Sequence, residues 1–439
     1  MIVAQTAVDE YTDIQALKVV VSHPHGNPNS YHAALALSEI GWLDQFETGI
    51  LNGSKALRVL SRFASIVDQR ASNRTFAQIP NGRKKTHRIF EVLARAGRKL
   101  KPRGLTSEIN WYDVLFSGHD FQVSGSLGKD LNAVFAYEDA ARRTFRAAIR
   151  AGATTLYELP LGYYKAVARD INRGREDWPA LQPGPYAEPV WKQLRKDAEL
   201  ALADVIVVAS DWARESLSLS DKASSKPIVL VPYGSPVDEI SPRSQAPGGP
   251  FTVLFAGQVG LRKGVPYLIE AWEKLNLRDA RLLLAGSMNL SREYLREHAA
   301  SFEYLSALPR AELIDLMATV DLFVFPSLAE GFGLVIGEAM ALGVPVLTTK
   351  NTGGPSLITD GIEGWCVRAH HVEPLIERIE WAYQNRDHLY EMGKRARQRA
   401  EQWTWADYRR KLVAELSPLI ANRADVENVR AKLAKLQRK

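Results

Sequence analysis

Two carboxylates and a glycine-rich turn lie close together in the second half of the chain. Glu330 and Glu338 are separated by seven residues, and the turn of residues 331–333 directly follows the first of them. Residues 334–342 carry apolar side chains at helical spacing and end at Gly343, so we expect a helix that begins at the turn. The first N–H groups of a helix lack partners within it and suit phosphate or sugar oxygens. Two glutamates beside such amides can hold sugar and ribose hydroxyls; the alternative is two solvated glutamates that flank a tight turn.

A second candidate group is the cationic loop of residues 257–264. It follows a predicted strand at 252–256 and precedes a predicted helix at 265–272. Arg262 and Lys263 stand near its end and Gln258 near its start. A bound diphosphate requires cations, and Arg offers a rigid fork of donors while Lys offers a mobile point charge. The sequence therefore predicts a diphosphate site in this loop, with two solvated loop cations as the alternative.

The elements that must position these groups alternate regularly between strand and helix. Residues 321–326, the turn, the helix and residues 344–348 form strand, loop, helix and strand, which is one parallel crossover unit. Chemistry in such sheets gathers at the carboxyl ends of the strands, where both candidate groups are expected. The alternation occurs on both sides of a stretch rich in proline and glycine at 238–250, so we predict two Rossmann-like domains joined by a linker.

The stretch from Glu330 to Val346, EGFGLVIGEAMALGVPV, resembles the Glu-x7-Glu signature of retaining, nucleotide-sugar-dependent glycosyltransferases of the GT-B fold, family four. The resemblance extends to Lys263, which matches the lysine before the last glycine of the family's cationic loop. Gln258 departs from the family, which has an arginine there, and Arg262 is the candidate to replace that charge. The resemblance covers residues 205–415 well and residues 17–200 only in outline. It implies two facing Rossmann-like domains with the active site in the cleft between them.

The resemblance also implies a reaction, in which a sugar moves from a nucleoside diphosphate to an acceptor hydroxyl with retention at the anomeric carbon. The leaving diphosphate gains charge in the transition state, where cations and amides stabilise it most. The diphosphate itself can deprotonate the acceptor, so neither a metal nor a cofactor is expected, and the sequence has no Asp-x-Asp pair. The implied catalytic residues are His119, Glu330 and Lys263. The implied donor-binding residues are Gly26, Gln258, Arg262, Lys263, Leu308, Gly331, Phe332, Gly333, Leu334 and Glu338.

Candidates in the first half of the chain depend on predicted strand ends. Residues 113–118 are predicted to form a strand that ends at His119, and in the resembled family a histidine at about this place faces the donor sugar. The alternative is a histidine that only caps the strand. Gly26 follows the first predicted strand, at 17–22, where the family has a glycine-rich loop. Acids after the strands predicted at 133–137 and 154–157 are acceptor-site candidates: Glu138, Asp139 and Glu158.

The expected domain boundaries follow from these elements. Residues 1–240 form the N-terminal, acceptor-binding domain, with a basic amphipathic insertion at about 57–103. Residues 251–402 form the C-terminal, nucleotide-sugar-binding domain. Residues 403–439 hold a helix that, by the resemblance, returns to the first domain, and then a basic tail. Residues 1–16 show no clear periodicity and are read as a loose leader.

Composition narrows the class of protein. The chain has 439 residues, 46% hydrophobic and 24% charged, with a single cysteine, which fits a soluble protein of two domains in a reducing compartment. No apolar run is long enough to span a membrane and no signal pattern opens the chain, so we expect a cytoplasmic protein. The net charge is +6, but residues 58–103 alone carry thirteen Lys and Arg against two acids. Amphipathic helices with basic faces bind anionic membranes; nucleic acid and a solvated insertion are the alternatives.

The favoured function is a retaining, metal-independent glycosyltransferase of the hexosyltransferase type. Its acceptor is expected to be a lipid-linked saccharide or a polysaccharide, and the basic segment places it at the inner face of the membrane. One alternative is a nucleotide-sugar epimerase on the same fold, which would convert the donor without any acceptor. The other is a non-catalytic GT-B protein that serves as a scaffold in a sugar pathway.

Overall fold

The computed structural model describes residues 17–49, 76–100, 110–181 and 185–421 of the chain. The expectations for residues 1–16, for the basic segment between 58 and 75 and for the basic tail lie outside the described residues. The described chain divides into two compact units. The first contains residues up to Glu158, Leu194–Ile206 and the residues from Arg409 onward, and the second contains Leu159–Gln193 and Val207–Tyr408.

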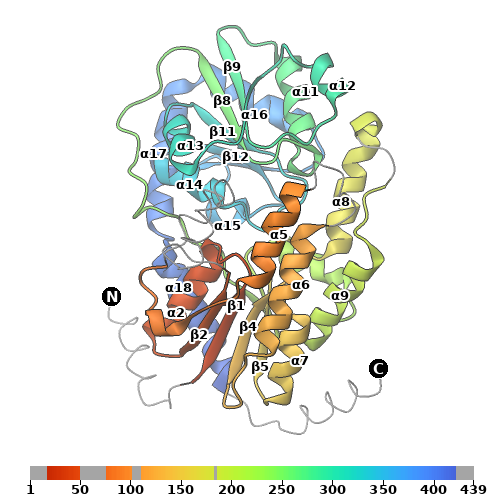
Figure 1. The fold of residues 1–439 in the computed structure, drawn as a ribbon. Coiled ribbons are helices and arrows are strands. Elements are labelled where there is room, and N and C mark those ends of the chain that lie inside the picture. The colour runs from red at the N-terminus through yellow and green to blue at the C-terminus, as the bar shows by residue number, and fades with distance from the viewer. Residues whose placement is uncertain (1–16, 50–75, 101–109, 182–184, 422–439) are drawn as a thin grey trace. The chain divides into compact units, whose positions relative to one another are not determined.

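The first of two sheets has the strand order β3-β2-β1-β4-β5-β6-β7 (Figure 1). β1 pairs in parallel with both β2 and β4, as expected for a doubly wound domain. All five residues of β1 are buried, and so are those of β4, because helices cover both faces of such a sheet. The strands are β1 (Val19–His23), β2 (Leu43–Thr48), β3 (Lys84–Thr86), β4 (Ala133–Tyr137), β5 (Thr154–Leu159), β6 (Val205–Val208) and β7 (Ile228–Leu230).

The helices between these strands begin where the sequence offers caps. Asn27 accepts a hydrogen bond from the Ser30 N–H at the start of α2, and Ser210 accepts one from the Ala213 N–H at the start of α10. The helices of this part are α2 (Pro28–Glu39), α5 (Ile89–Leu100), α6 (Trp111–Ser124), α7 (Arg142–Arg150), α8 (Tyr164–Asp177), α9 (Val190–Leu202) and α10 (Asp211–Ser216).

One expectation for the first half of the chain is wrong. Residues 113–118 do not form a strand, because they lie within helix α6, whose N-cap is Asn110. A short apolar run fits either element, and packing decides here: a Cβ on Gly118 would lie 2.0 Å from the ring of Phe90 on α5, so the two helices are in close contact. In the described part of the basic segment, Ile89–Leu100 forms the helix α5, as predicted, and Lys84–Thr86 is the edge strand β3.

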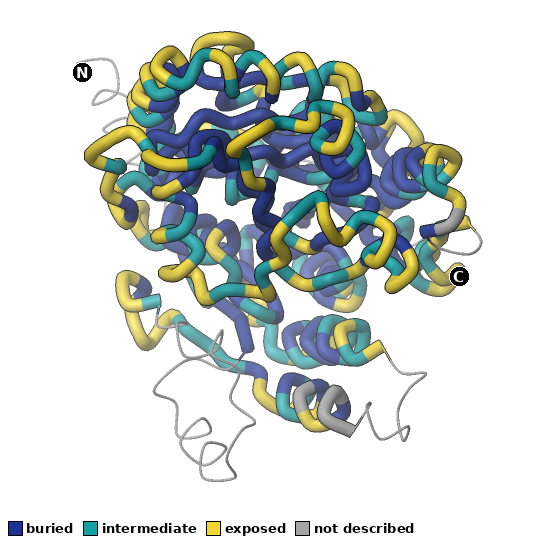
Figure 2. Tube along the Cα trace, turned by 90° about the horizontal axis from the view of Figure 1, so that it is seen from above, coloured by how far each residue is buried: buried dark blue, intermediate teal, exposed yellow. Residues whose placement is uncertain are grey.

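The second sheet has the order β10-β9-β8-β11-β12-β13, with parallel pairing. The crossover unit predicted between 321 and 348 is confirmed as β11, α14 and β12, and Gly343 caps α14 in the left-handed conformation. The strands are β8 (Phe251–Ala256), β9 (Ala280–Ala285), β10 (Glu303–Leu305), β11 (Leu322–Phe325), β12 (Val346–Thr349) and β13 (Gly364–Val367). Figure 2 shows the tube buried along strands and exposed mainly on outer helical turns and loops.

The helices of this part are α11 (Val265–Leu275), α12 (Arg292–Glu297), α13 (Arg310–Ala318), α14 (Leu334–Leu342), α15 (Gly354–Leu357), α16 (Glu373–Gln384), α17 (Arg386–Glu401) and α18 (Trp405–Ala421). α18 contributes Arg409 to the first unit, where it contacts Glu39 and His32 of α2. Two parallel sheets of the Rossmann type, each with flanking helices, make up the described fold. The predicted fold class, GT-B, is confirmed.

Candidate active site

Two loops of the second unit bring the predicted donor residues together. Strands β8 and β11 are neighbours in the sheet, so the loops after their carboxyl ends lie side by side. The amine of Lys263 contacts Oε2 of Glu330, and Nη1 of Arg262 lies 3.3 Å from the same oxygen. The same Nη1 also donates to the carbonyl oxygen of Ala329 at 2.9 Å. The cationic loop and the glutamate, 67 positions apart in the chain, therefore form one cluster.

Burial gives this cluster its electrostatic character. Burial alone would raise the pKa of Glu330, but the charges of Lys263 and Arg262 outweigh it and hold that pKa below its ordinary value. Burial also lowers the pKa of Lys263, although Glu330 partly opposes the shift. The glutamate is therefore an anion at neutral pH, beside two cations whose combined charge exceeds its own. An added anion, such as a phosphate, would find a net positive site there.

The backbone beside the cluster requires glycine at two positions. Gly264 has φ +68°, and a Cβ on it would lie 1.9 Å from the carbonyl oxygen of Pro326. Gly333 has φ +84° and is the N-cap of α14. Because glycine has no side chain, no side-chain cap hydrogen bond forms at the start of this helix. Both helices, α11 and α14, thus begin at a left-handed glycine next to the Lys263–Glu330 cluster. Helix starts of this kind favour anions through their N–H groups and their dipole.

Glu338 lies on α14 and is engaged by an arginine that sequence reasoning did not single out. Nε of Arg310 donates to Oε1 of Glu338 at 2.9 Å, and its Nη1 donates to Glu239 at 2.8 Å. Arg310 is the first residue of α13, and Leu308 lies half-buried in the preceding loop after β10. Only the fold reveals this contact, because residues 28 positions apart on different helices share no sequence pattern.

The remaining predicted donor residues are in the same loops. Gln258 is exposed directly after Gly257, at the end of β8. Phe332 is buried, and a Cβ on Gly353 would lie 2.3 Å from its ring. Gly331 packs on backbone, since a Cβ there would lie 1.8 Å from the carbonyl oxygen of Pro160. Leu334 is the first residue of α14.

His119 is in the first unit, but it does not follow a strand as predicted. It is a buried residue of α6, and its Nε2 lies 3.1 Å from Oγ of Ser22. Burial lowers its pKa well below the ordinary value, and the nearby imidazoles of His87 and His25 lower it further, so the ring is neutral. Gly26 is also in this unit, with φ +55°, and donates its N–H to Nδ1 of His23. The roles of His119 and Gly26 toward a donor stay predictions.

The acids at the ends of β4 and β5 are bound by other residues of the first unit. Asp139 accepts a hydrogen bond from Arg195 at 2.6 Å, and Glu138 forms an ion pair with Lys196 at 3.3 Å. Glu158 accepts a hydrogen bond from the amide of Asn29 at 3.4 Å. Arg195 and Lys196 are buried on α9 and were not anticipated from the sequence. The two ion pairs give Asp139 and Glu138 a structural role in addition to the predicted acceptor role.

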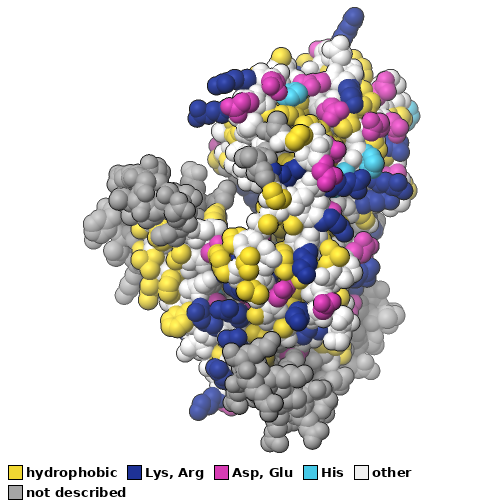
Figure 3. All heavy atoms as spheres, turned by 90° about the vertical axis from the view of Figure 1, so that its right-hand side faces the viewer, with side chains coloured by type: hydrophobic (Ala, Val, Ile, Leu, Met, Phe, Trp, Pro, Cys, Tyr) yellow, Lys and Arg dark blue, Asp and Glu magenta, His cyan; other side chains and the backbone are white. Residues whose placement is uncertain are grey.

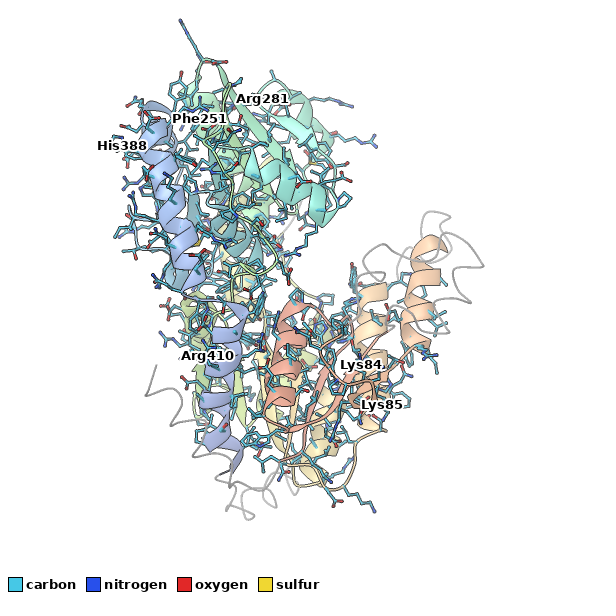
Figure 4. All side chains as sticks on the ribbon, turned by 90° about the vertical axis from the view of Figure 1, so that its left-hand side faces the viewer. Lys84, Lys85, Phe251, Arg281, His388 and Arg410 are labelled. Carbon is cyan, nitrogen blue, oxygen red and sulfur yellow. The ribbon has the colours of Figure 1, made fainter. Side chains whose placement is uncertain are left out.

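The basic segment is only partly free to act as a charged surface. Arg83 contacts Asp44 and Lys85 contacts Glu47, while the amine of Lys84 donates to the carbonyl oxygen of Phe76. Lys84 and Lys85 lie next to each other on β3 (Figure 4). Within the described residues, no helix combines the length and apolar character that a membrane crossing requires. Nor do these residues contain a group of three or more His, Cys, Asp or Glu arranged to hold a metal ion.

Comparison with known proteins identifies the part of the chain that holds the cluster. Residues 236–399 match the family model described as "Glycosyl transferases group 1". These residues belong to that family. Among similar curated proteins are the D-inositol 3-phosphate glycosyltransferases of Nocardia farcinica, 32% identical over 52% of this chain, and Corynebacterium aurimucosum, 28% identical over 57%. The matches cover 55% and 64% of those two proteins, so the chain spans a little over half the length of the curated relatives it matches.

Solved structures support the fold over most of the chain. Anabaena HepE in complex with UDP and glucose has a TM-score of 0.58 at 16% identity, with 92% of this chain and all of that chain covered. Sucrose-phosphate synthase from Thermosynechococcus elongatus has a TM-score of 0.57 at 16% identity, covering 92% and 99%. At such identity the likeness concerns the fold alone.

Proposed function

We propose that the chain is a retaining glycosyltransferase that moves a hexosyl group from a nucleoside-diphosphate sugar to a hydroxyl of a lipid-linked saccharide or a polysaccharide. The observation that carries the proposal is the meeting of Lys263 and Arg262 with Glu330 at the adjacent ends of β8 and β11. The family match includes all three residues. The names of the curated relatives support sugar transfer, and the UDP bound to Anabaena HepE supports a nucleotide donor.

In the proposed reaction, the bond between the anomeric carbon and the β-phosphate oxygen breaks, and its electron pair leaves with the diphosphate. The acceptor oxygen bonds to the same carbon on the same face, and its proton passes to the departing phosphate oxygen. Lys263, Arg262 and the first amides of α14 stabilise the growing phosphate charge. Glu330 orients sugar hydroxyls and keeps Lys263 in place, while Glu338 holds the ribose. No metal ion or cofactor takes part in this scheme.

In this proposal the first unit binds the acceptor and contacts the membrane. Ile89 and Leu93 are 62% and 49% exposed on α5, one helical turn apart, and the cationic Arg88 precedes them. Figure 3 shows apolar and cationic side chains exposed side by side on the face it presents. An apolar ridge beside cations fits the surface of an anionic membrane, where lipid-linked acceptors reside. A phosphorylated cyclitol is a second acceptor class to test, because the curated relatives are named for inositol 3-phosphate.

The decisive experiment supplies purified protein with UDP-glucose or another nucleotide sugar as donor. Each donor is tested with three acceptors: lipid-linked saccharide in anionic vesicles, a polysaccharide, and inositol 3-phosphate. We expect a glycosylated product in the parent and at least a hundredfold lower kcat in K263A and E330A. The matched controls K274A and E270A remove an exposed ion pair on α11 and should leave turnover unchanged.

Three outcomes separate the proposal from its alternatives. Equal turnover in the parent and in K263A would overturn the assigned roles. Conversion of the donor without any acceptor would identify an epimerase instead. Binding of UDP with no turnover across all acceptors would favour the non-catalytic scaffold.

A further inference from the structure

Residues 328–333, which carry Glu330 and are called the Glu330 turn below, are held both by the cationic loop and by residues outside the cluster. The Leu328 N–H donates to the carbonyl oxygen of Arg262 at 2.9 Å, which ties the two site loops together. On the other side, the Glu330 N–H donates to the carbonyl oxygen of Asn351 at 3.1 Å. The side-chain amide of Asn351 donates to the carbonyl oxygen of Leu328 at 2.7 Å. One residue, Asn351, thus binds the turn on both sides of Ala329.

The Asn351 amide also reaches a buried carboxylate on α8. Its Nδ2 lies 3.4 Å from Oδ2 of Asp170, so its two hydrogens have two acceptors, the Leu328 carbonyl and this carboxylate. Asp170 is 5% exposed and also accepts hydrogen bonds from Trp212 Nε1 at 3.2 Å and from Arg169 at 2.7 Å. A buried carboxylate held by several donors is rigidly oriented and costly to disturb.

Steric contacts link α8 to the same turn independently of the hydrogen bonds. A Cβ on Gly174 of α8 would lie 2.6 Å from Cδ1 of Leu328 and 3.3 Å from Cδ1 of Leu261. These two leucines stand two residues before Glu330 and two residues before Lys263. A methyl group at this point of α8 would displace the end of the Leu328 side chain, so the helix backbone packs directly against leucine side chains of both site loops.

We propose that Asp170 and Asn351 are positioning residues that couple helix α8 to the turn of Glu330. Asp170 orients the Asn351 amide, the amide fixes the Leu328 carbonyl, and the turn in consequence presents the Glu330 carboxylate to Lys263. A shift of α8 would be transmitted to both site loops through Asp170 and through the Gly174–Leu328 contact. The kinetic consequence, a slower transfer step at unchanged donor affinity, rests on the proposed function, whereas the ordering of the turn does not.

The first test measures hydrogen exchange of the backbone amides of residues 328–333 in the protein without donor. We expect roughly fivefold faster exchange in N351A, which is the factor that loss of one neutral hydrogen bond produces, and exchange faster than in the parent in D170A. N385A is the matched control, because the Asn385 amide donates to the carbonyl oxygen of Trp381 at 2.8 Å, away from the turn. The proposal would be overturned if residues 328–333 exchange in N351A and D170A as slowly as in the parent. It would also be overturned if N385A accelerates the exchange of these residues equally.

The second test separates positioning from general stability. With UDP-glucose as the probe, N351A and D170A should lower kcat about tenfold while the KM for the probe changes less than twofold. D170N keeps an oxygen acceptor for Asn351 and should recover most of the loss. If D170A does not fold, N351D replaces it, since a second carboxylate facing Asp170 and the Leu328 carbonyl breaks the same contacts at equal volume. Loss of kcat in D170N equal to that in D170A would contradict the positioning role.

The two tests also distinguish failure of this coupling from failure of the proposed function. If the parent turns over no nucleotide sugar, the proposed function fails, and the exchange measurement still decides whether α8 orders the turn. If the parent is active and exchange in the variants is unchanged, the coupling fails alone.

Discussion

Arg310 and Glu338 form a 2.9 Å hydrogen bond between helices α13 and α14, and Glu338 is the residue proposed to hold the donor's ribose. Because Arg310 is half exposed, the contact with Glu338 is expected to contribute at most about 1 kcal/mol. R310A should therefore raise the KM for UDP-glucose up to about fivefold and leave kcat unchanged. R281A removes an arginine of similar exposure, which pairs with Glu303, and serves as the control. An unchanged KM in R310A would show that Glu338 needs no support from Arg310.

Removal of Lys263 should destabilise the fold as well as abolish activity. Glu330 would remain buried with Arg262 as its only partner in the cluster, and breaking a buried ion pair on one side costs roughly 3 kcal/mol. K263M should accordingly lower the free energy of unfolding in urea, and the double variant K263M/E330Q should regain part of the loss. If the double variant is as unstable as the sum of the two single variants, the two side chains do not interact energetically.

The lowered pKa of Glu330 predicts the direction of its effect on acid stability. The folded-state pKa lies below the unfolded value, so its stabilising contribution is present above the ordinary carboxyl pKa and is lost as the pH falls through the folded-state pKa. In E330Q the stability should therefore fall less steeply than in the parent below the ordinary carboxyl pKa. Urea unfolding at a series of acidic pH values measures this slope, and identical slopes would exclude the pairing with Lys263.

The raised pKa of Glu199 in the first unit predicts the opposite dependence of folding stability on pH. Burial raises its pKa to about 8, with Asp139 adding to the shift, although the backbone N–H groups of Ala141 and Asp139 oppose it. The stability contributed by the neutral carboxyl is full below pH 4.5 and is lost as the pH rises through about 8. E199Q, which mimics the neutral acid, should abolish this loss between pH 5 and pH 9, measured as roughly constant urea midpoints. A decline equal to that of the parent would refute the raised pKa.

Gly264 predicts a steric requirement at the start of α11. G264A combines a left-handed φ with an overlap on the Pro326 carbonyl, so we expect a loss of about 3 kcal/mol or more in the free energy of unfolding. G361A is the matched control, because Gly361 has φ +79° but nothing within 4 Å of its Cβ position. It should lose only about 1 kcal/mol. Equal losses in the two variants would mean that the Pro326 contact relaxes at no cost.

Membrane contact predicts a response to the apolar ridge of α5 as well as to charge. I89S/L93S should reduce sedimentation with vesicles of anionic phospholipid several-fold, and so should reversal of the charges of Arg83, Lys84, Lys85 and Arg88. I362S is the control, because Ile362 is 45% exposed and lies outside α5. Because some of these cations bind Asp44, Glu47 or backbone, the charge-reversed protein must first show parent-like urea unfolding. Equal sedimentation of the parent and both variants would remove the membrane from the proposal.

The sequence by itself determined the alternation of strand and helix and the chemistry of the two site loops. Left-handed glycines, N-caps and apolar runs are local features, so the crossover unit from β11 to β12 and the cap at Gly343 could be predicted without a structure. Placing Lys263 near the turn of Glu330 required only that parallel strands collect their loops at one edge.

The tertiary structure alone decided what surrounds those loops. Residues 113–118 became a helix because packing of Gly118 against Phe90 prevailed over a local pattern that fits either element. The contact of Arg310 with Glu338 and that of Asp170 with Asn351 join residues 28 and 181 positions apart. Contacts of that kind depend on how elements pack, and packing is set by the summed shape and burial of many side chains rather than by any short sequence pattern.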